Sequence, residues 1–241
     1  MVFLAVGLSS AAAGFLQTVT GFGAATVLML VLPYFFDMAA APALSSSICM
    51  GLAASLALRF RHAIRLRLVL LPSLIYTAVS ILAIRLAAGA DLRLLSIGFG
   101  VFLTALSVYF LFFGSKAALK SGPVSMVACS AVSGVCAGLF SIGGPTMALY
   151  YLAVTERKEE YLGNIQFLFA VTYAAGLPQR VSSGAYTAAL LPMTVLGIGA
   201  ILAGRQLGLR VSERLDPERV KKLVFLYVGL TGILTLVRHL V

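Results

Sequence analysis

Five stretches of the chain, each close to 20 residues long or longer, carry no charged side chain, and they constrain its fold more than any other feature. They cover residues 38–58, 94–113, 123–155, 161–179 and 181–204. A helix needs about 20 mostly apolar residues to cross the hydrocarbon core of a bilayer. Two shorter stretches, 68–84 and 223–237, reach this length if flanking Arg and Lys side chains extend to the interface. We therefore expect an all-α membrane protein, a polytopic helical bundle.

The composition agrees, because 61% of the 241 residues are hydrophobic and only 11% are charged, against about 25% charged residues in soluble domains. The net charge of +10 does not indicate a nucleic-acid partner. The basic residues lie in short loops between the expected spans, where positive charge sets the orientation in the membrane. We expect the lipid bilayer as a partner and no nucleic acid. The three cysteines, Cys49, Cys129 and Cys136, lie in apolar runs and form no metal-ligand set, so we expect neither metal nor cofactor.

The chain is an internal repeat. A shift of 120 residues places Gly14 on Gly134, Gly23 on Gly143 and Thr26 on Thr146. We divide it into a first transmembrane repeat (1–115), a linker loop (116–122) and a second transmembrane repeat (123–241). Many secondary transporters are built from two such halves.

The opening segment of each half, 1–36 and 123–154, is too long for one comfortable span and too short for two. Each is interrupted by glycines, at "TGFG" (20–23) and at "SIGGP" (141–145). Glycine and proline weaken helices, so we expect two shorter helices per segment that meet inside the membrane. They form either a re-entrant hairpin or a broken helix, and three transmembrane helices follow in each half.

Loop charges favour segments that fold back and do not cross. In that arrangement one face holds fourteen Lys and Arg and the other holds four, whereas full crossing gives eight against ten. The uneven count satisfies the positive-inside rule and places both termini outside. Three crossings per half is an odd number, so the two repeats would be inverted relative to each other.

The breaks suit an anion. Backbone at a break loses its intrahelical hydrogen bonds, and the helix that follows begins with free N–H groups and a positive dipole end. We expect both breaks to form one substrate cradle, with members Gln17, Thr20, Gly21, Gly23, Thr26, Ser141, Gly143, Gly144 and Thr146. The alternative is that the glycines only permit close helix packing.

Other polar residues within the apolar runs are open to either interpretation, packing or ligand binding. These are Ser46 in the first half and Asn164 and Gln166 in the second. Four tyrosines near the expected interfaces are typical of belt residues: Tyr150, Tyr151, Tyr161 and Tyr186.

The segments "GFLQTVTGFGAA" and "GVCAGLFSIGGPTMALYYL", opening two similar halves, resemble the sulfite exporter family of TauE/SafE-like transporters. The resemblance covers essentially the whole chain. It implies export of sulfite, sulfoacetate or other organosulfonates across a bacterial inner membrane. With two repeats, alternating access would come from one half of the protein rocking against the other. Carried over by position, the resemblance adds Pro145 to the breaks and places the site at Gln17, Thr20, Gly21, Gly23, Ser141, Gly143, Gly144, Pro145 and Thr146. A homodimer is one assembly state that the sequence leaves open.

The expected spans contain no Asp or Glu, although proton-driven carriers usually hold an ionisable residue inside the membrane. We therefore expect anion export with little coupling, since an inside-negative potential favours exit by about 2.3 kcal/mol per charge per 100 mV. The spans offer no carboxylate, histidine or metal set for an enzyme. An anion channel lined by the same backbone groups is the remaining alternative.

Overall fold

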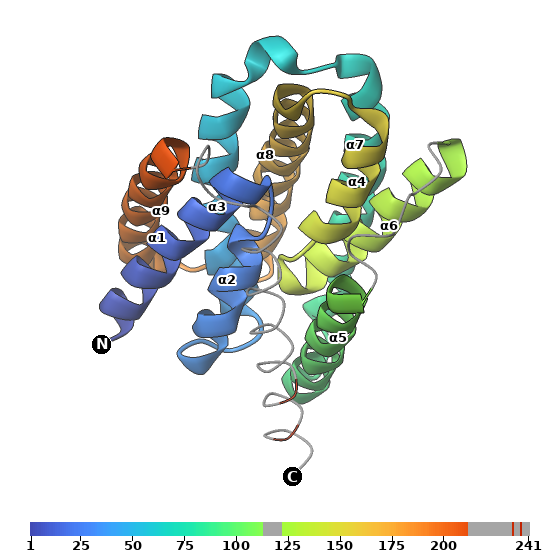
Figure 1. The fold of residues 1–241 in the computed structure, drawn as a ribbon. Coiled ribbons are helices and arrows are strands. Elements are labelled where there is room, and N and C mark those ends of the chain that lie inside the picture. Colours follow the sequence, from blue (N-terminus) through green and yellow to red (C-terminus); the bar gives the residue numbers. More distant parts are fainter. Residues whose placement is uncertain (113–121, 212–232, 234–236, 238–241) are drawn as a thin grey trace.

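The computed structural model describes residues 1–112, 122–211, 233 and 237, and the described residues are helical with no strand. The first half contains α1 (Val2–Thr20), α2 (Ala24–Val31), α3 (Ala40–Arg59), α4 (Leu66–Ala87) and α5 (Leu92–Phe112). The second half contains α6 (Pro123–Phe140), α7 (Gly144–Val154), α8 (Lys158–Ser182) and α9 (Leu191–Val211) (Figure 1). Three short 3-10 turns, η1 (Leu32–Tyr34), η2 (Arg61–Ala63) and η3 (Ala188–Leu190), connect some of them.

Five segments among the described residues are long and apolar enough to cross a membrane: α1, α3, α4, α6 and the segment 188–210 that contains α9. The prediction of a polytopic helical membrane protein is thus confirmed. The bounds predicted for α3 and α4 are close to those observed. The predicted span 223–237 lies almost entirely outside the described residues.

The span predicted over residues 181–204 corresponds to α9, but both of its predicted ends were wrong. Helix α8 continues to Ser182, and the chain then turns at Gly184, whose φ of 75° is left-handed. Helix α9 begins only at Leu191. The turn carries no charge, so an uncharged run could not reveal it.

A helix ends at each of the two predicted interruptions. The first break, residues 21–23, separates α1 from α2, and the second break, residues 141–143, separates α6 from α7. Gly21 and Gly23 have φ of 87° and 103°, a conformation that glycine adopts without steric cost. Ser141 has φ of 62°, which is uncommon for a residue with a side chain.

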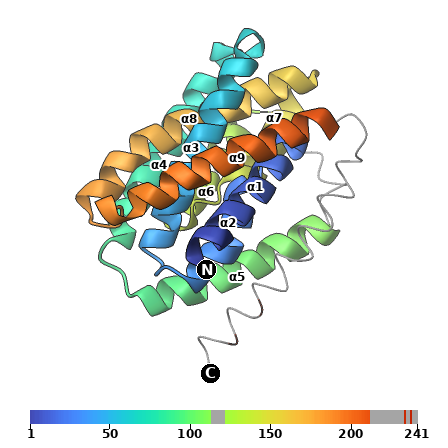
Figure 2. The ribbon, with the colours of Figure 1, turned by 90° about the vertical axis from the view of Figure 1, so that its left-hand side faces the viewer.

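Close helix pairs join the two halves. Helix α1 packs along α9, and α6 packs along α4 in the equivalent way, while α3 and α8 pack against each other in the centre (Figures 1 and 2). Gly14 and Gly204 bring the backbones of α1 and α9 into contact, with Gly14 against the Ile201 carbonyl and Gly204 against the Ala11 carbonyl. The repeat equivalent of Gly14, Gly134, lies against the backbone of α4. These repeated glycines serve helix packing.

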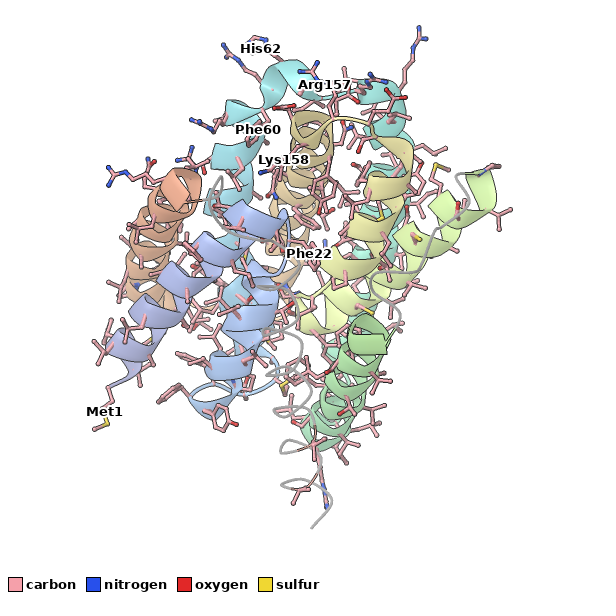
Figure 3. The ribbon with its side chains drawn as sticks, in the orientation of Figure 1. Met1, Phe22, Phe60, His62, Arg157 and Lys158 are labelled. Atoms are coloured by element: carbon pink, nitrogen blue, oxygen red, sulfur yellow. The ribbon has the colours of Figure 1, made fainter. Side chains whose placement is uncertain are left out.

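Two basic loops lie at the same end of the molecule, far from Met1. Figure 3 shows His62 and Arg157 at one end and Met1 at the other. A pocket of about 400 Å³ at this end is lined by residues of both loops, including Arg59, Arg65 and Arg157. An ion pair of 2.6 Å between Arg65 and Glu160 links them. Opening segments that crossed fully would separate these loops, so their proximity favours segments that fold back.

Candidate functional site

The first break is held together by side chains that satisfy its free backbone groups. The Gln17 amide oxygen accepts a hydrogen bond of 3.1 Å from the Ala24 N–H, the first of α2. The Gln17 Nε2 donates to Gln166 Oε1 at 2.8 Å, and Gln166 Nε2 donates to the Gly21 carbonyl at 2.7 Å. Both glutamine side chains are buried. A buried amide is costly unless it is paired, and here two amides pair each other across the two halves.

Thr20 and Tyr161 complete the first break. The Thr20 hydroxyl lies within donating distance of the Leu16 and Phe22 carbonyl oxygens, at 2.9 and 2.7 Å, and shares its one proton between them. The Tyr161 hydroxyl donates to the Thr20 carbonyl at 3.1 Å, and its ring lies directly against Gly21. Tyr161 is only 6% exposed, so the prediction that it is an interfacial belt residue was wrong. The buried positions of Tyr150 and Tyr151 contradict the same prediction for them. A position near the end of an expected span does not tell which face of the helix meets lipid.

The second break has a different arrangement. The Ser141 N–H donates to the Ala137 carbonyl at 2.9 Å and ends α6, but the buried Ser141 hydroxyl has no partner among the described residues. Gly143 lies against the Tyr76 hydroxyl of α4, where a Cβ would not fit. The Thr146 hydroxyl in the first turn of α7 bonds to the Ser133 hydroxyl. Pro145 occupies the start of α7, where its missing N–H costs nothing.

The two breaks meet. A Cβ built on Gly144, at the start of α7, would lie 3.0 Å from the Phe22 Cβ and 3.5 Å from the Phe169 ring. Figure 3 shows Phe22 in the middle of the molecule. Helix α8 runs past both breaks, because Gln166 contacts the first and Phe169 contacts the second. The fold therefore joins two segments that are 120 residues apart in sequence.

Three of the polar residues selected from the sequence do not bond to either break. Ser46 donates to the Ala43 carbonyl within α3, and Thr26 is buried in the first turn of α2. The Asn164 carbonyl oxygen accepts the Arg65 N–H at 2.8 Å, so Asn164 holds the start of α4. Its Nδ2 is buried without a partner among the described residues.

Two buried ionisable residues of α8 escaped the sequence analysis. The Arg180 side chain is 5% exposed and donates from Nη2 to the carbonyls of Ala137 and Gly138, at 3.2 and 3.1 Å. Glu160, also buried, pairs with Arg65. Both flank the uncharged run 161–179, where the charge pattern predicts loops. The helix extends beyond the run at both ends, which the run itself does not show. Within the described ranges, no three His, Cys, Asp or Glu side chains lie close enough to hold a metal ion.

Comparison with known families is decisive for the class of protein. The family model described as sulfite exporter TauE/SafE matches residues 6–235. The chain belongs to the TauE/SafE family. Its members are membrane transporters of sulfite or related anions rather than enzymes, and this chain is a multi-pass membrane protein of that kind. No curated protein and no solved structure matches it.

Proposed function

We propose that this protein exports small sulfur-containing anions, namely sulfite, sulfoacetate or other organosulfonates, across the bacterial inner membrane by alternating access around the two breaks. Membership of the TauE/SafE family supports the substrate class. The observation that carries the rest is the contact between Phe22 of the first break and Gly144, the residue that directly follows the second break. A substrate held where the two breaks meet contacts both halves of the chain, as in transporters built from repeats.

The proposed site comprises the break residues Gln17, Thr20, Gly21, Gly23, Ser141, Gly143, Gly144, Pro145 and Thr146, together with Gln166 of α8. They supply hydroxyls, amides and backbone N–H groups but no carboxylate, which suits an anion. Ser46 and Asn164 belong to this site only if the helices rearrange during transport, since their present bonds lie within α3 and at the start of α4. Thr26, buried in the first turn of α2, belongs to it on the same condition.

The repeats are proposed to be inverted and to open with re-entrant segments. The equivalent packing of α1 on α9 and of α6 on α4 supports the repeat. The proximity of the loops around His62 and Arg157 supports the re-entrant topology. Tyrosine and phenylalanine rings lie against the break glycines, which supports a carrier rather than a channel that is open at this point.

The test is flux in proteoliposomes under a set membrane potential, with sulfite, sulfoacetate, taurine, sulfate and chloride in parallel. We expect voltage-dependent flux of sulfite and sulfoacetate, because an anion gains about 2.3 kcal/mol per charge per 100 mV. Thr20→Val and Ser141→Ala should lower it at least tenfold. Thr18→Val is the matched control, since the Thr18 hydroxyl donates to the Gly14 carbonyl within α1 and not to either break. Counterflow, in which unlabelled substrate on one side drives labelled substrate uptake, separates a carrier from a channel. Taurine flux alone, or flux that none of the variants changes, would contradict the proposal.

A further inference from the structure

The two breaks differ in how completely their polar groups are hydrogen-bonded. At the first break, side chains from both halves bond to the Thr20 and Gly21 carbonyls and to the Ala24 N–H. At the second break the Ser141 hydroxyl is 1% exposed and, within the described residues, unpaired. A buried hydroxyl without a partner is unfavourable, because it has lost its hydrogen bonds to water. A ligand with hydrogen-bond acceptors is therefore better accommodated at the second break than at the first.

A buried positive charge lies beside the second break. Arg180 is 5% exposed, and the two ion pairs found among the described residues, Arg65–Glu160 and Arg157–Glu159, do not include it. The carbonyl end of α6 carries partial negative charge and offsets part of the guanidinium charge. A full charge removed from water is still unfavourable unless an opposite charge balances it.

Arg180 and Ser141 converge on one atom. The Ala137 carbonyl oxygen accepts from Arg180 Nη2 at 3.2 Å and from the Ser141 N–H at 2.9 Å. The hydrogen bonds that the Arg180 side chain makes to described residues come only from Nη2. A guanidinium has five N–H donors in a planar fork that matches the oxygens of an oxyanion. The Nε and Nη1 donors can therefore serve a ligand without releasing α6.

We propose that the transported anion binds at the second break, with the Arg180 guanidinium as its counter-charge and the Ser141 hydroxyl as a further donor. This inference rests on the proposed function and adds to it a specific charge at one of the two breaks. The ligand class is a small oxyanion of sulfur, and a dianion gains more from Arg180 than a monoanion does.

The experiment measures equilibrium binding to purified protein in nanodiscs, using sulfoacetate as the dianion and methanesulfonate as the monoanion. Arg180→Gln should weaken sulfoacetate binding roughly 10- to 100-fold, the fold-change that corresponds to losing hydrogen bonds to a charged group. The preference for sulfoacetate over methanesulfonate should fall as well. A purely structural role for Arg180 would weaken both ligands equally. Arg85→Gln is the control, because Arg85 is an exposed arginine bonded to Gln179, the neighbour of Arg180. It should stay within about twofold of the wild type.

Two further variants keep the test decisive if Arg180→Gln does not fold. Arg180→Lys keeps the charge but loses the fork, so binding should weaken about threefold to tenfold while the dianion preference remains. Ser141→Gly removes the hydroxyl and suits the left-handed φ of 62°, so the fold is kept and sulfoacetate binding should weaken severalfold.

Wild-type affinity in Arg180→Gln or in Ser141→Gly overturns the inference, as does an equal loss for both ligands. If the wild type still shows voltage-dependent sulfoacetate flux, the proposed function survives that failure. A wild type that binds neither ligand removes both proposals.

Discussion

Replacing Gln166 by leucine should destabilise the protein through the loss of two buried hydrogen bonds. The Gln166 side chain joins Gln17 at 2.8 Å and the Gly21 carbonyl at 2.7 Å, and leucine leaves the Gln17 Nε2 and this carbonyl unpaired. Mutational series in soluble proteins give about 1 kcal/mol per bond and 1 to 3 kcal/mol per orphaned group. Hydrogen bonds in a membrane bundle average about 0.6 kcal/mol. The free energy of unfolding should therefore fall by about 1 to 4 kcal/mol.

Gln179→Leu is a matched control on the same helix, because the Gln179 side-chain oxygen accepts an exposed hydrogen bond from Arg85. Its effect should stay within about 0.5 kcal/mol. Unfolding by SDS in mixed micelles, followed by circular dichroism, compares the two variants. The double variant Gln17→Leu with Gln166→Leu should cost less than the sum of the single changes, since each single change orphans the other amide. Superimposable unfolding curves for Gln166→Leu and Gln179→Leu would refute the view that this network holds the first break.

Two further predictions concern packing and topology. Gly204→Ala should destabilise the protein by about 2 to 4 kcal/mol, because the added methyl group collides with the Ala11 carbonyl. Gly199 has open space around it, so Gly199→Ala should be neutral or stabilising by up to about 1 kcal/mol. Unfolding curves that rank the two variants the other way would contradict the α1–α9 contact. Cysteines introduced as His62→Cys and Arg157→Cys should be labelled by a membrane-impermeant maleimide from the same side of the membrane, as their shared pocket requires. Labelling from opposite sides would favour opening segments that cross fully.

The sequence predicted the helical class, the family and the positions of both breaks. Uncharged runs and glycine clusters are local signals, and the repeat is visible when one half of the sequence is placed on the other. The sequence could not place Arg180 or Tyr161. An arginine at the end of an uncharged run has the same pattern whether it reaches solvent or turns inward to the carbonyls of another helix. Tyr161 faces a glycine 140 residues away, and no periodicity within α8 records that contact. The long-range partners of buried polar groups depend on how helices from the two halves pack.

The same cross-half packing determines which parts of the chain can exist separately. Helix α1 has its closest partner, α9, in the other half, and α6 has its closest partner, α4, likewise. Among the described residues the two halves are thus intertwined, and the most extensive helix packing runs between them rather than within either half. Severing the chain between α5 and α6 would give two fragments that expose glycine-lined helix faces until each finds the other. A movement of one half against the other would therefore have to break the α1–α9 and α4–α6 contacts or carry these helices together.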